Sequence, residues 1–132
     1  MLDVHFLGPI IDERKVSAYM FASDIMVVPG RLGLIVIHSY CFDLPVISQE
    51  NIGTSQGEGI SFLKHGETGY LVQDGNLNEM TQCILQLLHS EQLQLTFKEN
   101  IRKTLQEECG FEKMMSGFED VITFVNKNER ID

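Results

Sequence analysis

The feature that most constrains the fold of this chain is the segment 24–49, where apolar stretches alternate with short turns. Residues 25–28 are all apolar and end at a Pro-Gly pair, which is typical of a strand buried on both faces of a parallel sheet. Residues 34–40 continue as a mostly apolar helix, and residues 46–48 follow Pro45 as a second strand. A strand, a helix and a strand joined by short turns predict a parallel β-α-β unit.

The turn inside this unit is a candidate ligand site. Gly30 and Gly33 give a turn that is able to adopt positive φ and that lets a ligand approach the backbone. The helix that starts at Leu34 has its N-terminus at the carboxyl end of a parallel strand, where free N–H groups and the helix dipole favour a phosphate. We therefore expect the N–H groups of Gly33 and Leu34 to hold an anion.

Further elements are indicated on both sides of this unit. Residues 4–8 form a short apolar stretch closed by Gly8-Pro9 and are predicted to be a strand. Residues 65–72 are predicted to hold a turn, marked by its glycines, and an edge strand. Asp12 is expected to cap a helix that leads toward the central unit. These elements together predict four strands in an α/β, Rossmann-like three-layer parallel sheet with helices on its faces.

The C-terminal half is predicted to be helical. Asn76 with Glu79 resembles a capping box, Ser90 can cap a second helix, and Gly110 is expected to end it. A third helix carries an apolar stripe at helical spacing, which we interpret as core or as an interface. This apolar stripe comprises Phe111, Met114, Met115, Phe118, Val121, Ile122 and Val125.

Composition limits the class of protein and of partner. A length of 132 residues with 43% hydrophobic residues predicts one globular domain, 1–132. The net charge of −9 argues against nucleic acid and anionic membranes as partners. Three widely spaced cysteines predict buried or free thiols in a reducing cytoplasm and no metal site. The first residues lack the features of a signal peptide, and no apolar run is long enough to span a membrane.

The segment PGRLGLIVIHSYCFDLPVIS resembles the signature of the retaining, nucleotide-sugar-dependent glycosyltransferases of family 4, which have the two-domain GT-B fold. The Gly33-Leu34 pair and the Pro45-Val46-Ile47 run match that signature in place and spacing. The likeness covers residues 3–90 closely. It implies that the chain is the C-terminal, donor-binding part of such an enzyme, and thus a fragment of a larger protein.

The resemblance also implies roles for individual residues. Gly30 stands in place of a glutamate that contacts the donor sugar, and it offers only its backbone. His38 stands in place of a glutamate that binds ribose hydroxyls, and an imidazole can accept one such hydrogen bond or donate to a phosphate. A structural alternative places His38 inside an apolar layer between Ile37 and Tyr40. The predicted donor-binding residues are Gly30, Arg31, Gly33, Leu34, His38 and Glu58.

The polar loop 49–59 follows the second strand and contains three glycines. Its place after the carboxyl end of a parallel strand favours a ligand role, and a solvated connection is the alternative. Glu58 lies near the position where family members have a Pro-Glu pair that begins a short helix close to the donor.

The implied reaction is transfer of a hexosyl-type sugar from a UDP-, GDP- or ADP-linked donor to a hydroxyl of a glycan or polysaccharide acceptor, without a metal or other cofactor. The acceptor would be held by an N-terminal domain outside this chain, so the isolated chain is expected to be inactive. The full-length enzyme is expected in the cytoplasm or at the inner membrane surface. Self-association through a bare sheet edge or the C-terminal helices is a further expectation.

Two other functions are left open by the sequence. The first is a nucleotide- or protein-binding Rossmann-like module without catalytic activity. In the family resembled, a pair of basic residues binds the pyrophosphate, and the absence of such a pair here supports this alternative. The second is a receiver or flavodoxin-like domain, which is less favoured because no acidic cluster follows the first predicted strand.

Overall fold

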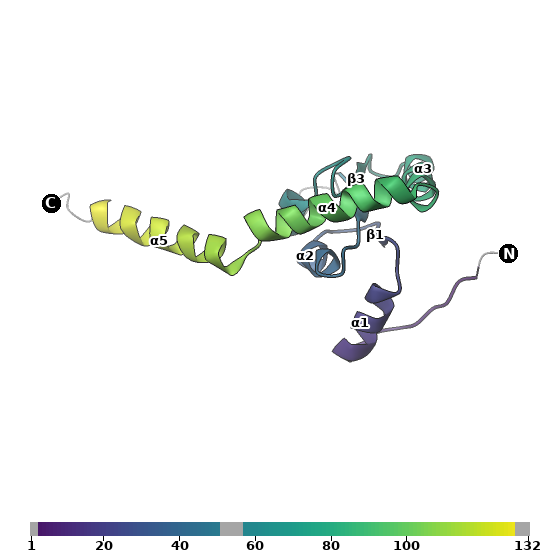
Figure 1. Ribbon diagram of the computed structural model, residues 1–132, viewed down its shortest axis with the longest axis horizontal. Coiled ribbons are helices and arrows are strands. Elements are labelled where there is room, and N and C mark those ends of the chain that lie inside the picture. Colours follow the sequence, from purple (N-terminus) through teal and green to yellow (C-terminus); the bar gives the residue numbers. More distant parts are fainter. Residues whose placement is uncertain (1–2, 51–56, 129–132) are drawn as a thin grey trace.

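The computed structural model describes residues 3–50 and 57–128, and a parallel sheet lies at its centre (Figure 1). The sheet has three strands in the order β1 (Met26–Val28), β2 (Val46–Gln49) and β3 (Gly69–Val72). Val27 of β1 is in register with Ile47 of β2, which is in register with Tyr70 of β3. The predicted β-α-β unit and the α/β, Rossmann-like class are therefore confirmed.

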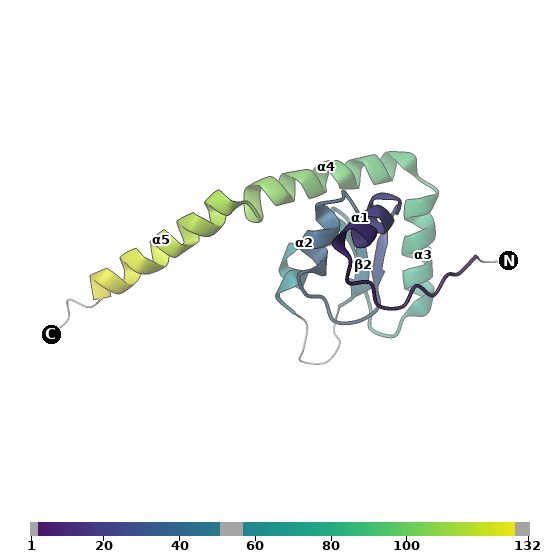
Figure 2. The same ribbon diagram turned by 90° about the horizontal axis from the view of Figure 1, so that it is seen from below.

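Helices flank the sheet, and nearly all of the chain from Leu77 to Asn128 is helical. They are α1 (Glu13–Phe21), α2 (Ile35–Tyr40), the short 3₁₀ helix η1 (Glu58–Phe62), α3 (Leu77–Leu88), α4 (Glu91–Glu108) and α5 (Phe111–Asn128). Figure 2 shows α2 and α3 on opposite sides of the sheet, with α4 running across its end. This is the expected three-layer arrangement.

Alternation along the strands divides the core in two. Val46 of β2 belongs to a first cluster, under α2 and η1, and its neighbour Ile47 belongs to a second cluster, under α3. Helix α4 contributes to both, with Ile101 in the first cluster and Phe97 in the second. The first cluster contains Leu32, Val36, Tyr40, Val46, Leu63 and Ile101. The second contains Ile47, Tyr70, Val72, Met80, Leu87 and Phe97.

The predicted helix starts are confirmed by their capping hydrogen bonds. Asp12 accepts from the backbone N–H of Arg14 at 3.0 Å, and Ser90 accepts from that of Leu93 at 3.3 Å. Asn76 Oδ1 accepts from the N–H of Glu79 at 3.1 Å. These side chains satisfy donors that have no partner within the helix, so local sequence fixes where each helix begins.

Two predictions about strands are wrong. Residues 4–8 form no strand; they are exposed, and Phe6 is 96% accessible. A strand is stable only beside a paired neighbour and over a face that it buries, and in the described part of the chain this segment has neither. Strand β1 is half-buried rather than buried on both faces, because it lies at the edge of the sheet.

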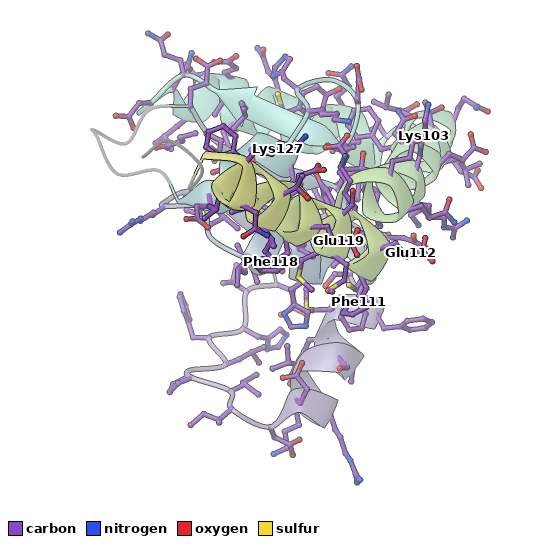
Figure 3. All side chains as sticks on the ribbon, turned by 90° about the vertical axis from the view of Figure 1, so that its left-hand side faces the viewer. Lys103, Phe111, Glu112, Phe118, Glu119 and Lys127 are labelled. Atoms are coloured by element: carbon purple, nitrogen blue, oxygen red, sulfur yellow. The ribbon has the colours of Figure 1, made fainter. Side chains whose placement is uncertain are left out.

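Helix α5 extends away from the sheet (Figures 1 and 2). All seven residues of its apolar stripe are exposed, so the interpretation of the stripe as core is wrong within the described residues. In Figure 3, Phe111 and Phe118 lie on the lower side of α5 and Lys127 lies on its upper side. No helix in the described ranges combines the length and the hydropathy needed to cross a membrane.

Tyr40 joins α2 to the segment between η1 and β3, and it gives the fold a predicted pH dependence. Its fully buried hydroxyl lies 2.7 Å from Thr68 Oγ1 and 3.1 Å from the carbonyl oxygen of Phe62. Burial raises the pKa of Tyr40 to about 12, although the hydrogen bond with Thr68 opposes the rise. Between about pH 10 and pH 12 the folded chain therefore keeps a proton that the unfolded chain loses.

The free energy of unfolding should therefore fall as the pH rises above 10, and Tyr40 should account for about 2–3 kcal/mol of that fall by pH 12. Tyr40→Phe should be less stable than wild type at pH 8 by about 1–2 kcal/mol, because the buried hydrogen bond between Tyr40 and Thr68 is lost. The difference in free energy of unfolding between wild type and Tyr40→Phe should become smaller as the pH rises, because only wild type carries the Tyr40 proton. Urea unfolding of both proteins from pH 8 to 11.5 measures this difference. A difference that stays constant over that range would contradict the raised pKa of Tyr40.

Candidate functional site

A hollow of about 400 Å³ lies near the carboxyl ends of β1 and β2. One wall comes from the segment between β1 and α2, and the other from the start of η1. Its lining residues are Arg31, Gly33, Leu34, Gly57, Glu58 and Gly59. The structure thus brings together four of the six predicted donor-binding residues and leaves Gly30 and His38 outside the lining. Open α/β sheets bind ligands in this position, beyond the carboxyl ends of their strands.

Backbone donors at the start of α2, two of them on residues that line the hollow, have no partner in the described part of the chain. Across residues 3–50 and 57–128, the N–H groups of Gly33, Leu34 and Ile35 donate no hydrogen bond. Leu34 is the N-cap of α2, and its apolar side chain makes no capping bond. The other N-caps described above use Asp, Asn or Ser for this purpose. Uncapped N–H groups beside an open hollow can bind an anion.

Helix α2 has only six residues, so its dipole is small and the N–H groups themselves must supply most of any attraction. Arg31 adds a positive charge and Glu58 a negative charge to the lining. Both side chains are exposed, and neither forms an ion pair within the part of the chain that the structure describes. Arg31 is therefore able to turn toward a bound anion without breaking a described ion pair.

Gly30 and Gly33 do not use the positive φ that glycine allows. A Cβ atom built on either glycine meets no atom within 4 Å. The turn is made with ordinary backbone angles, so these glycines contribute open space and not conformational freedom.

Two glycines that the sequence analysis did not single out are tightly enclosed. A Cβ atom on Gly57 would lie 2.1 Å from the carbonyl oxygen of Leu32, and one on Gly59 would lie 1.9 Å from that of Gly33. Only glycine allows these two segments to approach so closely. The spacing of Gly57 and Gly59 around Glu58 was a visible signal, but the sequence does not show which segment they would contact.

Ser48 ties the end of β2 to the turn that leads into the site. Its buried hydroxyl lies 2.8 Å from the carbonyl oxygen of Val28 and 3.4 Å from that of Gly30. The contact holds the carboxyl end of β1 and the residue after Pro29 in place. Gly30 therefore supports the turn although it does not line the hollow.

His38 points toward α1 and not into the hollow. Its Nε2 atom lies 3.4 Å from Glu13 Oε1, and its ring meets the edge of Phe42 with centroids 5.6 Å apart. The side chain is 35% exposed and has a polar neighbour, so the alternative of a histidine enclosed in an apolar layer is wrong. To contact ribose as predicted, His38 would have to leave Glu13 and turn toward the hollow.

Other parts of the predicted site are only partly visible. Residues 51–56 of the polar loop lie outside the described residues, so the predicted ligand role of that loop rests on residues 57–59 alone. The three cysteines, Cys41, Cys83 and Cys109, are free thiols. Within the described ranges, no group of three or more histidine, cysteine or acidic side chains is arranged to hold a metal ion.

Comparison with known proteins identifies relatives of this chain. A family model described as "Glycosyl transferases group 1" matches residues 2–90. N-acetyl-alpha-D-glucosaminyl L-malate synthase of Bacillus anthracis is 27% identical over 130 residues, which cover 96% of this chain and 32% of the relative. The chain thus spans about a third of the length of that relative.

Solved structures share the fold at lower identity. Sucrose-phosphate synthase of Thermosynechococcus elongatus has a TM-score of 0.70 at 24% identity, over 92% of this chain and 30% of that one. The C-terminal domain of a group 1 glycosyl transferase of Francisella tularensis has a TM-score of 0.65 at 18% identity, over 80% and 53%. Anabaena HepE in complex with UDP has a TM-score of 0.65 at 20% identity, over 92% and 32%. The chain therefore belongs to the group 1 glycosyltransferases and corresponds to a C-terminal part of such a protein.

Proposed function

We propose that this chain holds the nucleotide-sugar donor of a glycosyltransferase, with the diphosphate in the hollow beside Gly33. The observation that carries the proposal is the set of free N–H groups at Gly33, Leu34 and Ile35, which face no acceptor within the described residues. Membership of the group 1 glycosyltransferases supplies the chemical class of the ligand.

The free N–H groups suit a diphosphate because they are neutral donors in a fixed arrangement. Hydrogen bonds to a charged group contribute about 1.5–3 kcal/mol each, more than those between neutral groups. Arg31 at the same wall would add a cation in a chain whose net charge is −9. Backbone donors at the site thus provide a way for an acidic chain to bind an anionic ligand.

Glu58 would contact a different part of the donor. An ionised carboxylate only accepts hydrogen bonds, so it suits sugar or ribose hydroxyls and repels phosphate. Glu58 and Gly33 line the same hollow, so a donor bound there could place its diphosphate at the free N–H groups and a hydroxyl-bearing ring at Glu58. His38 remains a proposed ribose contact, on condition that it leaves Glu13.

In the whole protein, the donor sugar would pass to a hydroxyl of a glycan acceptor. This chain would position the donor and stabilise the negative charge that develops on the leaving diphosphate. We propose that residues 1–132 are one domain of a longer cytoplasmic enzyme, that another domain holds the acceptor, and that neither a metal nor another cofactor takes part.

Titration with UDP, GDP and ADP by calorimetry tests the proposal. UDP is the first probe because Anabaena HepE was solved with UDP. At least one of the three should bind, and Arg31→Ala should weaken that binding about tenfold, which corresponds to 1.4 kcal/mol. Arg14→Ala removes the same charge from exposed α1 and should leave the affinity unchanged.

Absence of binding by all three nucleotides at millimolar concentration would contradict the proposal. Equal loss in Arg31→Ala and Arg14→Ala would show that only the net charge matters, and not the hollow. Binding without sugar transfer by the full-length protein would favour the alternative, a nucleotide-binding module without catalytic activity.

A further inference from the structure

We infer that Gly57 and Gly59 are positioning residues, which set the direction of the N–H groups that bind the diphosphate. The inference rests on the proposed function and assigns two residues to it that make no hydrogen bond to the ligand themselves. Its basis is the close approach of the start of η1 to the backbone of Leu32 and Gly33.

The approach is a contact between two backbone segments. A Cβ atom on Gly57 would lie 2.1 Å from the oxygen of Leu32 and 3.3 Å from the Cα atom of Gly33. One on Gly59 would lie 1.9 Å from the oxygen and 2.7 Å from the carbonyl carbon of Gly33. Because these atoms belong to the backbone and not to a flexible side chain, a larger residue would have to displace the peptide groups.

Those peptide groups carry the donors of the site. A peptide bond is planar, so its carbonyl oxygen and the N–H of the next residue move together. The oxygen that Gly57 approaches shares a plane with the N–H of Gly33. The oxygen that Gly59 approaches shares a plane with the N–H of Leu34. Pressure on either oxygen therefore rotates an N–H group that the proposed function assigns to the diphosphate.

A comparison with other glycines of the chain shows that close backbone contact at the hollow is specific to Gly57 and Gly59. Gly69 in β3 meets an equally close neighbour, since its Cβ atom would lie 1.9 Å from the oxygen of Val46, but that contact lies within the sheet. Gly30 and Gly33 have open space around them. Tight enclosure at the wall of the hollow is thus a property of Gly57 and Gly59.

The start of η1 is held in place by Ile60. This half-buried side chain packs against the first core cluster, so it anchors the segment that carries both glycines. Ile84 of α3 is also half-buried and packs against the second cluster. Substitution of Ile60 therefore tests the segment next to the hollow, and the same substitution of Ile84 is a control in another part of the fold.

The first experiment is Gly59→Ala, followed by NMR of backbone amides and by titration with UDP. Without ligand, the amide signals of Gly33 and Leu34 should shift, and the affinity for UDP should fall at least tenfold. Gly69→Ala, with an equally close clash, should disturb the signals of β2 and β3 and leave the UDP affinity of the folded protein within threefold. Wild-type affinity in Gly59→Ala would overturn the inference.

The second experiment does not depend on the folding of these variants. Ile60→Ala should weaken UDP binding by about threefold or more, and Ile84→Ala should not. Equal effects of the two substitutions would overturn the inference. Two failures can be told apart. If wild type binds none of UDP, GDP and ADP, the proposed function fails, whereas unchanged amide signals of Gly33 and Leu34 in ligand-free, folded Gly59→Ala contradict the positioning role itself.

Discussion

Phe97→Ala is expected to lower the free energy of unfolding by about 3–5 kcal/mol. Phe97 is 1% exposed and lies in the second core cluster, where its ring centroid is 5.4 Å from that of Tyr70. Truncation removes a large buried ring and leaves a cavity between α4 and β3. Domains of this size are stable by only about 5–15 kcal/mol, so the loss is a large share of the total.

Leu95→Ala in the same helix is the matched control. Leu95 is 50% exposed, and its loss should cost under about 1 kcal/mol. Urea unfolding followed by circular dichroism compares the two variants with wild type. Similar midpoints for Phe97→Ala and Leu95→Ala would mean that α4 does not pack against the sheet through Phe97.

Gly33→Asp is expected to reduce the affinity for UDP at least a hundredfold. The space around Gly33 is open, with no atom within 4 Å of the position of a Cβ atom, so the fold should accept the new side chain. Its carboxylate would enter the hollow, repel the diphosphate and compete for the free N–H groups. The thermal midpoint should change little while UDP binding is lost.

Gly117→Asp provides a control with the same change of charge. Gly117 lies in α5 and also has open space around it, but it is far from the hollow in sequence and does not line it. Calorimetric titration of both variants should show loss of UDP binding in Gly33→Asp alone. If Gly33→Asp still binds UDP, the diphosphate does not bind at Gly33.

Local patterns in the sequence predicted most of the fold. The apolar runs 25–28 and 46–48 predicted two strands whose ends agree with those of β1 and β2 to within one residue. The prediction works because a buried strand needs continuous apolar residues. Asp12, Asn76 and Ser90 predicted the starts of three helices, because capping depends on residues within one turn. The same information could not show that residues 4–8 lack a strand partner.

The site was predicted in part, for a similar reason. The Gly33-Leu34 turn was found from its own sequence, whereas its enclosure by Gly57 and Gly59 depends on a contact between segments more than 20 residues apart. His38 follows Leu34 by four residues and so lies on a similar side of α2, but about 6 Å further along the axis. At that point it meets Glu13, a contact that no local pattern predicts.

Helix α5 marks another limit of the sequence. Its apolar stripe correctly predicts an amphipathic helix, but periodicity shows only that one face is apolar and not what would cover it. The stripe is exposed over the described residues, so of the two alternatives the core is excluded there, and the interface stays a prediction.

The most direct test of the account is a titration of ¹⁵N-labelled protein with UDP, followed by the backbone amide signals. The signals of Gly33, Leu34 and Ile35 should shift most, to a common dissociation constant, because their N–H groups would gain the diphosphate as acceptor. Signals of α3 and α5 should stay in place. Shifts confined to other elements, or none at the three N–H groups at saturating UDP, would contradict the claim that this turn binds the donor.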